Sequence, residues 1–392
     1  MRTCALSGAT RRLQRTGDAI RSRRPECRRL IDSEGTHRMS KQQLNPARIP
    51  GLFRRQFELC RVTQGETVVL LTDGSTRRDY VQAAQVAAED LGASVYEMGL
   101  SSSPAWLHIG VDIMGRAKGM MEALCAADLI CVFHPPNFSG WQKRVREAGA
   151  RVLSIADSPD VLARLMSPPG LKEAVQYAAE LWGNAREIRL LSDAGTDLTW
   201  RRGEFKVKQQ YGFAEAPGRF DAWGAGHITN FPDEGSTNGV VVLSPGDMWI
   251  LPYIRAIENP VRLEVRDGFI RKVEGGLDAK AFRYWLDSNK RSADDLDPYA
   301  VSHLGVGLHP GGHWDQIMRH GNNFDELHIM ARVFAGNFLF STGPNTDMGG
   351  KRDTKGHIDA PMCDCTVLLD GKLLMERGRF VDDRLIVRAA GR

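Results

Sequence analysis

Six of the ten histidines lie within one stretch of 55 residues near the C-terminal end, a region that is also rich in Gly and Asn. They are His303, His309, His313, His320, His328 and His357. Imidazole nitrogens bind transition metals and exchange protons near neutral pH. The clustering therefore indicates residues 300–360 as the region in which chemistry is expected.

His357 and Asp359 form an H-x-D element within this region. In an extended chain, side chains two positions apart point to the same side, so the imidazole and the carboxylate would converge. One more distant His would complete a 2-His-1-carboxylate triad, which binds Fe(II) and leaves coordination positions open for substrate and O₂. Asp and His also cap turns, so the spacing alone leaves a purely structural role open.

The third ligand is approached by elimination, beginning with His309 and His313. Their i, i+4 spacing would suit a pair of helical ligands, but Pro310, Gly311 and Gly312 lie between them. A Pro-Gly-Gly run does not sustain a helix, so both histidines are predicted to be loop residues.

The remaining histidines of the cluster differ in their surroundings. His328 lies in the amphipathic segment "DELHIMARVF", where a histidine is ordinarily packed or solvated. No nearby residue pattern indicates a metal-binding partner for His320. His303 precedes the Gly-spaced "LGVGLHP", at the end of a predicted strand that enters a loop. Such a position readily presents a ligand, so elimination favours His303.

The N-terminal half alternates apolar strands with amphipathic helices. Strands are predicted at 67–71, 94–98, 129–133 and 151–155, with helices at 77–91, 117–127 and 141–149. Successive β-α-β units imply a parallel sheet with helices on both faces. The strand-to-helix turns contain neither G-x-G-x-x-G nor a Walker pattern, so neither a dinucleotide nor a nucleoside triphosphate is indicated.

Pro and Gly at 166–170 interrupt this alternation, and we divide the chain there into an α/β domain (39–168) and an α+β metal-binding catalytic domain (169–392). After a helix at 171–185, "DG" and "GD" pairs between short strands predict antiparallel hairpins. Further helices are predicted from 278 and near 325–335, with hairpin strands at the end. The expected fold class is an N-terminal doubly wound parallel-sheet domain plus an α+β domain that is rich in antiparallel strands and carries the metal site.

Composition restricts the classes of function. The 392 residues are 42% hydrophobic and 26% charged, which is ordinary for a globular protein. Residues 1–38 contain ten Arg against four acidic residues, so the net charge of +4 becomes −2 for the remainder. A nearly neutral body disfavours nucleic-acid binding, and no run of about 18 apolar residues predicts a membrane span.

The leader and the cysteines bear on the compartment. The Arg-rich leader (1–38) lacks the Ser content of a transit peptide, and Met39 looks like a natural start, so we interpret the leader as an over-long start or a disordered tail. The seven cysteines follow no regular spacing, which predicts free thiols in a reducing cytoplasm. Cys363 and Cys365 could bind metal, but the period-2 spacing of a strand explains the pair more simply.

Three segments carry a family resemblance. "FLFSTGPNTDMGGKRDTKGHIDAPM" (338–362), "SHLGVGLHP" (302–310) and "YGFAEAPGRFDAW" (211–223) resemble the 2,5-dihydroxypyridine 5,6-dioxygenases of bacterial nicotinate and nicotine catabolism. That family is related to thermophilic-type leucyl aminopeptidases. The resemblance extends over about residues 40–385, so the leader lies outside it.

The resemblance implies an iron site and a reaction. It assigns Fe(II) to His303, His357 and Asp359, the residues that elimination also favours. The aminopeptidase branch has Glu at the place of His303 and binds two metal ions, so His303 indicates one iron rather than a dinuclear hydrolytic centre. The implied reaction is an extradiol-type ring cleavage that places both atoms of O₂ in the product, which for 2,5-dihydroxypyridine is N-formylmaleamate.

Substrate-side residues are implied as well. His134 matches a family histidine that would act as acid or base toward the bound ring, with a structural role at a strand end as the alternative. Where the family has Glu and His, this chain has Gln210 and Ala222. Loss of that pair should change which ring substituents the pocket recognises, because unpaired polar contacts discriminate strongly. The reaction class is expected to persist with a different preferred ring.

Ser302 and Arg352 are further predicted substrate contacts, and Glu204, His227 and Arg255 are weaker candidates for the pocket. The expected partners are a small aromatic substrate and O₂, in a cytoplasmic protein that forms a homo-oligomer. Two other classes remain as alternatives. An aminopeptidase-type metallohydrolase would need bridging carboxylates, and a non-catalytic binding protein with a degenerate site would be expected to lack at least one ligand.

Overall fold

The computed structural model describes residues 44–133 except 101–117, residues 140–314 except 253, and residues 329–389. These residues belong to one compact unit. None of the helices in these ranges combines the length and the apolar character needed to cross a lipid bilayer. The five cysteines within the same ranges are free thiols, as the sequence predicts.

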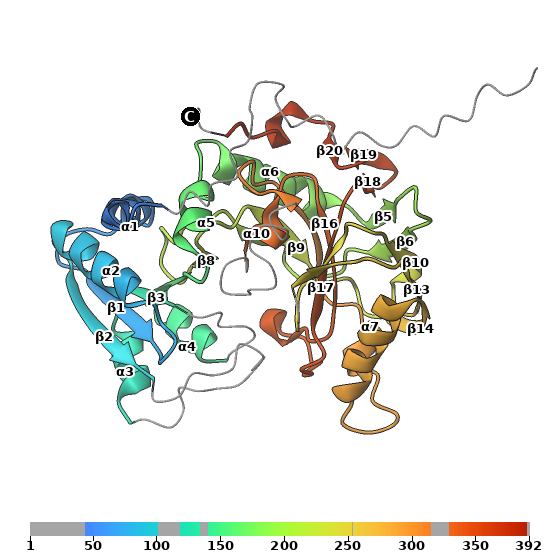
Figure 1. The fold of residues 1–392 in the computed structure, drawn as a ribbon, viewed down its shortest axis with the longest axis horizontal. Helices are drawn as coiled ribbons and strands as arrows, with labels where there is room; N and C mark the ends of the chain where they lie inside the picture. Colours follow the sequence, from blue (N-terminus) through green and yellow to red (C-terminus); the bar gives the residue numbers. More distant parts are fainter. Residues whose placement is uncertain (1–43, 101–117, 134–139, 253, 315–328, 390–392) are drawn as a thin grey trace, which may run out of the picture. The chain divides into compact units, whose positions relative to one another are not determined.

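A parallel sheet forms the first part of the fold (Figure 1). Its strands, in spatial order, are β2 (Ser94–Gly99), β1 (Thr67–Thr72), β3 (Leu129–Val132), β4 (Arg151–Ser154) and β8 (Phe220–Ala222). All four neighbouring pairs are parallel. Strands β3 and β4 are buried along their whole length and β1 along nearly all of it, which matches their near-continuous apolar sequences.

Helices cover both faces of this sheet, so the predicted doubly wound arrangement is confirmed. They are α1 (Ile49–Leu59), α2 (Arg78–Asp90), α3 (Met120–Cys125), α4 (Trp141–Glu147) and α5 (Pro159–Arg164), whereas α6 (Leu171–Asn184) packs in the core of the antiparallel sheets. Helices α1 and α2 share a core with Leu70 and Leu129, whereas α3 and α4 share one with Val69 and Ile130. Alternate residues of each strand therefore face opposite helical layers.

Strand β8 lies beyond position 168, where the sequence analysis places the domain boundary, yet it pairs with β4 at the edge of the parallel sheet. Its three residues, Phe220 to Ala222, are too few for a periodic signal. The boundary itself stays a prediction.

An eight-stranded antiparallel sheet follows. Its order is β14 (Phe269–Gly275), β13 (Val261–Arg266), β10 (Asn238–Leu243), β6 (Asp197–Arg201), β5 (Glu187–Leu191), β18 (Thr366–Leu369), β19 (Lys372–Glu376) and β20 (Arg379–Phe380). The predicted "DG" turns connect β13 to β14 and β18 to β19. Asp267, Gly268, Asp370 and Gly371 all have positive φ, as a two-residue hairpin turn requires.

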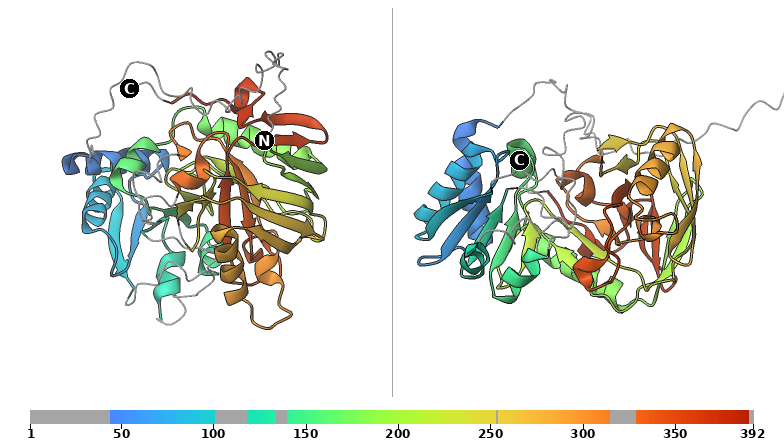
Figure 2. Two further views of the ribbon diagram at one scale, coloured as in Figure 1. Left: turned by 45° about the vertical axis from the view of Figure 1, so that its right-hand side comes forward. Right: turned by 90° about the horizontal axis from the view of Figure 1, so that it is seen from below.

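A second, five-stranded sheet is antiparallel throughout. Its order is β17 (Ile358–Met362), β16 (Phe338–Thr342), β15 (Leu304–Gly307), β9 (His227–Asn230) and β7 (Lys208–Gln210). One face supplies Ile228, Leu304, Phe340 and Ile358 to a core that the eight-stranded sheet shares. Figure 2 shows β16 and β17 beside that larger sheet. The opposite face of the five-stranded sheet does not contribute to this shared core.

Shorter elements complete the described chain: β11 (Met248–Trp249), β12 (Arg255–Ala256), α7 (Leu277–Ser288), α10 (Met330–Val333) and the 3-10 helices η1 (Pro46–Arg48), η2 (Asp297–Tyr299), η4 (Thr346–Met348) and η5 (Asp383–Leu385). One interpretation from the sequence is wrong. Cys363 and Cys365 lie in the turn between β17 and β18 rather than in a strand, because Asp364 between them has φ 53°.

Candidate metal centre

His303, His357 and Asp359 lie on the five-stranded sheet, on the face opposite the shared core. His303 directly precedes β15, His357 directly precedes β17, and Asp359 is the second residue of β17. Their neighbours Leu304 and Ile358 face the shared core. Because side chains alternate along a strand, the three candidate ligands face the other side.

The three side chains converge on one point. One ligand atom from each can be chosen so that all three lie within 4.8 Å of one another. Asp359 Oδ1 is 3.1 Å from Nε2 of His303 and 3.4 Å from Nε2 of His357. Among the described residues, no donor makes a hydrogen bond to this buried oxygen. In the part of the chain that the structure describes, this is the one group of three or more His, Cys, Asp or Glu side chains suited to a metal ion.

A backbone carbonyl orients His357. Its Nδ1 lies 2.6 Å from the carbonyl oxygen of Thr342 in β16. A carbonyl can only accept, so Nδ1 carries the proton and Nε2 is the ring nitrogen that faces Asp359. Metal-binding histidines are typically held in this way, by a hydrogen bond from the ring nitrogen that does not bind the metal.

Arg332 of α10 holds the other oxygen of Asp359. Its Nε lies 2.6 Å from Asp359 Oδ2, which leaves Oδ1 to face the two imidazoles. Burial opposes the charge on Asp359, but Arg332 and the two histidines outweigh it and hold the pKa of this carboxyl well below its usual range. Arg332 is absent from the candidates drawn from the sequence. An Arg in the apolar run "HIMARVF" indicates a buried cation that needs a partner, but the run does not show which residue that partner is.

His303 is held neutral. Burial lowers the pKa of its imidazole, and this effect exceeds the opposing influence of the Asp359 carboxylate. Metal binding requires an unprotonated imidazole and an ionised carboxylate. Two imidazoles beside one charged carboxylate therefore fit a single Fe(II) ion, with coordination positions left for other ligands.

His309 makes the contacts of a packed loop residue. Its Nε2 lies 3.2 Å from the carbonyl oxygen of Leu165, and the backbone N–H of Gly311 donates to its Nδ1 at 3.0 Å. Burial lowers the pKa of this imidazole to about 4. His309 lies outside the metal group, whereas the predicted acid-base residue His134 and the histidines at 320 and 328 lie outside the described residues.

Two predicted substrate contacts lie close to the ligands in the chain and have partners of their own. The Ser302 hydroxyl donates to the carbonyl oxygen of Pro344 at 2.6 Å. Arg352 donates to the carbonyl oxygen of Val301 at 3.0 Å, and its Nη1 is 3.3 Å from Glu234. Both residues hold the segment that precedes His303, and their contact with substrate stays a prediction.

The two positions at which the resemblance predicts a departure from the family motif lie at the ends of two strands. Gln210 ends β7 and is paired with His227 at the start of β9. Ala222 ends β8, where it is buried in a cluster with Leu165 and Ile250. Gln210 therefore lies on an edge strand of the antiparallel five-stranded sheet, and Ala222 lies on an edge strand of the parallel sheet.

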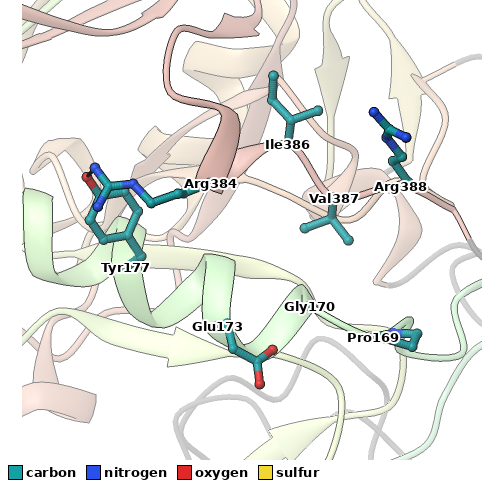
Figure 3. A pocket seen from close by; sticks show the side chains of 8 residues that line it. All are labelled: Pro169, Gly170, Glu173, Tyr177, Arg384, Ile386, Val387 and Arg388. Carbon is teal, nitrogen blue, oxygen red and sulfur yellow. Dashed lines mark hydrogen bonds between the residues drawn. The ribbon is translucent and has the colours of Figure 1, made fainter.

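A pocket elsewhere on the surface is separate from the metal group. It has a volume of about 420 Å³ and is lined by Pro169, Gly170, Glu173, Tyr177, Arg384, Ile386, Val387 and Arg388. Figure 3 shows the Arg384 guanidinium over the ring of Tyr177, at 3.9 Å from the ring centroid. None of the candidate metal ligands lines this pocket.

Arg332→Leu is expected to weaken metal binding by about ten- to a hundredfold, since partners of metal ligands typically contribute that much. The substitution leaves Asp359 buried without its cation and frees Oδ2 to rotate away from the present orientation. Competition with a chromophoric chelator would measure the change in affinity.

Arg255→Leu is the matched control for this variant. Arg255 Nη2 lies 2.6 Å from Asp278, a fully buried carboxylate that is not part of the metal group. Breaking either buried ion pair should lower the unfolding temperature. Equal losses of iron affinity in the two variants would mean that Arg332 acts through stability alone.

Comparisons with known proteins identify the family of this chain. Residues 48–382 match the family model of 2,5-dihydroxypyridine 5,6-dioxygenase. A curated enzyme of that name from Pseudomonas putida KT2440 is 34% identical over 350 residues, which cover 86% of this chain and 96% of the relative.

Two solved structures are also similar to this chain. The 2,5-dihydroxypyridine dioxygenase structure from Pseudomonas putida KT2440 superposes with a TM-score of 0.82 at 32% identity, covering 87% of this chain and 99% of the other. AmpT from Thermus thermophilus shares the fold, with a TM-score of 0.59 at 13% identity. This match covers 86% of this chain and 99% of the AmpT chain. The chain belongs to the 2,5-dihydroxypyridine 5,6-dioxygenase family.

Proposed function

We propose that this protein is an Fe(II)-dependent, extradiol-type ring-cleaving dioxygenase that acts on a hydroxylated N-heteroaromatic such as 2,5-dihydroxypyridine. The observation that carries the proposal is the convergence of His303, His357 and Asp359 in a chain of this family. The product from 2,5-dihydroxypyridine would be N-formylmaleamate. The setting would be cytoplasmic aromatic catabolism, as in nicotinate degradation, and the active form a homo-oligomer.

Iron would be held by Nε2 of His303, Nε2 of His357 and Oδ1 of Asp359. When bound, it would supply open coordination positions for the ring hydroxylate and O₂, the chemistry by which both oxygen atoms enter the opened product. The ring itself provides the electrons, so no external reductant is required.

The protein's own residues prepare this centre. Arg332 keeps Asp359 ionised, and the Thr342 carbonyl keeps the lone pair of His357 directed at the centre. Burial of His357 and Asp359, with His303 partly buried beside them, limits the access of bulk water and strengthens the interactions of the charged ring hydroxylate. His134 is proposed to exchange a proton with the bound ring.

A dinuclear hydrolase is less well supported. Such a centre needs several carboxylates that bridge two metal ions, and the group found among the described residues contains one, Asp359. The third alternative, a degenerate binding protein, is disfavoured because all three family ligands are present in the sequence.

Anaerobic reconstitution with Fe(II) tests the proposal. We expect about one iron per chain, because three protein ligands with open positions define a mononuclear site. O₂ uptake should follow addition of one member of a panel of hydroxypyridines and dihydroxybenzoates, and chelation should abolish it. Elemental analysis that finds two zinc ions per chain, together with peptidase activity, would overturn the proposal in favour of the hydrolase.

A further inference from the structure

His227 has a buried polar atom that the protein leaves without a partner. The residue is 6% exposed, and its Nδ1 makes no hydrogen bond with any residue that the structure describes. Leaving a buried donor or acceptor unpaired costs about 1–3 kcal/mol, and native proteins pair the great majority of such groups. The unpaired nitrogen therefore requires an explanation.

The position of His227 connects it to the metal centre. In the five-stranded sheet it lies directly opposite Gln210 on one side and Gly307 on the other. The next residue, Ile228, faces the shared core, so the His227 side chain lies on the face that carries the metal ligands. Burial, together with the charges of Lys208 and Arg332 and the His303 imidazole, lowers the pKa of His227 to about 3, with Asp359 opposing these effects.

A structural role does not account for His227. His309, another buried histidine with a lowered pKa, uses both ring nitrogens to join the carbonyl of Leu165 to the backbone N–H of Gly311. His227 forms no such connection through Nδ1. A phenyl ring of similar size would fill its place in the sheet without an unpaired nitrogen.

We propose that His227 hydrogen-bonds a hydroxyl group of the substrate ring and so determines which hydroxylated ring is accepted. This inference rests on the proposed function. A neutral imidazole offers one donor and one acceptor, which suits a ring carrying both types of group. Ala222, at the position where the family has its histidine, offers neither through its side chain. The carboxamide of Gln210, opposite His227, can add a second polar contact.

The test compares ring binding by His227→Phe and by the unaltered protein, both loaded with Fe(II) and kept free of O₂. Calorimetric titration would use 2,5-dihydroxypyridine and its two single-hydroxyl analogues, 3-hydroxypyridine and 2-hydroxypyridine. The variant should bind 2,5-dihydroxypyridine about ten- to a hundredfold more weakly, as expected for one lost buried hydrogen bond. Its preference over at least one analogue should shrink by the same factor.

Two readouts separate this role from a structural one. Iron content should be unchanged in His227→Phe, and its unfolding temperature without substrate should be equal or higher. His227→Gln, which keeps a donor and an acceptor, should recover part of the lost discrimination. His309→Phe is the matched control: it should lower the unfolding temperature and leave the discrimination intact.

The outcomes are distinct. If the unaltered protein discriminates among the three rings and His227→Phe discriminates equally well, the inference is wrong while the proposed function stands. A lower unfolding temperature of His227→Phe with unchanged discrimination would likewise assign His227 a structural role. If the unaltered, iron-loaded protein binds none of the rings of the wider panel, the proposed function fails and this inference fails with it.

Discussion

Replacing His303, His357 or Asp359 by Ala should in each case remove the iron and reduce turnover by more than about a thousandfold while the fold persists. A bound metal ion contributes several kcal/mol of transition-state stabilisation, and each 1.36 kcal/mol corresponds to tenfold in rate. With one of three ligands missing, the remaining pair cannot hold the ion in the same geometry. Iron content by mass spectrometry, together with circular dichroism, checks both parts of the expectation.

His309→Ala and His313→Ala serve as the controls, because neither residue belongs to the metal group. His309→Ala should lower the unfolding temperature, since Leu165 and Gly311 lose their partner, and it should retain iron. Loss of iron in His309→Ala combined with retention in His303→Ala would show that the ligands are wrongly assigned.

The combined substitution Gln210→Glu and Ala222→His should raise activity toward 2,5-dihydroxypyridine relative to the native substrate. The resemblance places an acid and an imidazole at these positions, and general acid-base assistance is typically worth about 10² to 10⁴ in rate. Ala222 is packed against Leu165 and Ile250, so the larger imidazole should also lower stability by about 1–3 kcal/mol. Steady-state kinetics on both substrates and thermal unfolding measure the two effects.

Gln210→Glu with Ala222→Leu is the matched control, because it crowds the same cluster without an imidazole. It should lower the unfolding temperature and leave the substrate preference near that of the unaltered protein. Should the unaltered protein already cleave 2,5-dihydroxypyridine with the efficiency of a dedicated enzyme, and the Glu-His pair prove neutral, these two positions do not select the substrate.

The parallel sheet was predictable because its signals are local. Strands β1, β3 and β4 are apolar runs between amphipathic helices, and such a run can be buried on both faces in one way only, between two helical layers. The hairpins were predictable for a similar reason, since Asp267-Gly268 and Asp370-Gly371 accept the positive φ values that tight turns require.

The sheet that carries the site has weaker local signals. Strands β7 and β9 have three and four residues, and β15 contains two glycines among four residues. Short segments of this kind show little periodicity, and their pairing depends on partners far away in the chain. The histidine region could be identified from residue types and from the H-x-D spacing. The strand order that brings its residues together could not be predicted in this way.

By itself, the sequence determined which residue types are available to a metal: two imidazoles and a carboxylate, with His357 and Asp359 on one side of an extended segment. Tertiary structure decided the rest, because β16 lies between β15 and β17 and brings His303 to 3.1 Å from Asp359. It also supplied Arg332, the Thr342 carbonyl and the unpaired nitrogen of His227. These contacts join segments distant in the chain and depend on burial, which no local pattern of residues encodes.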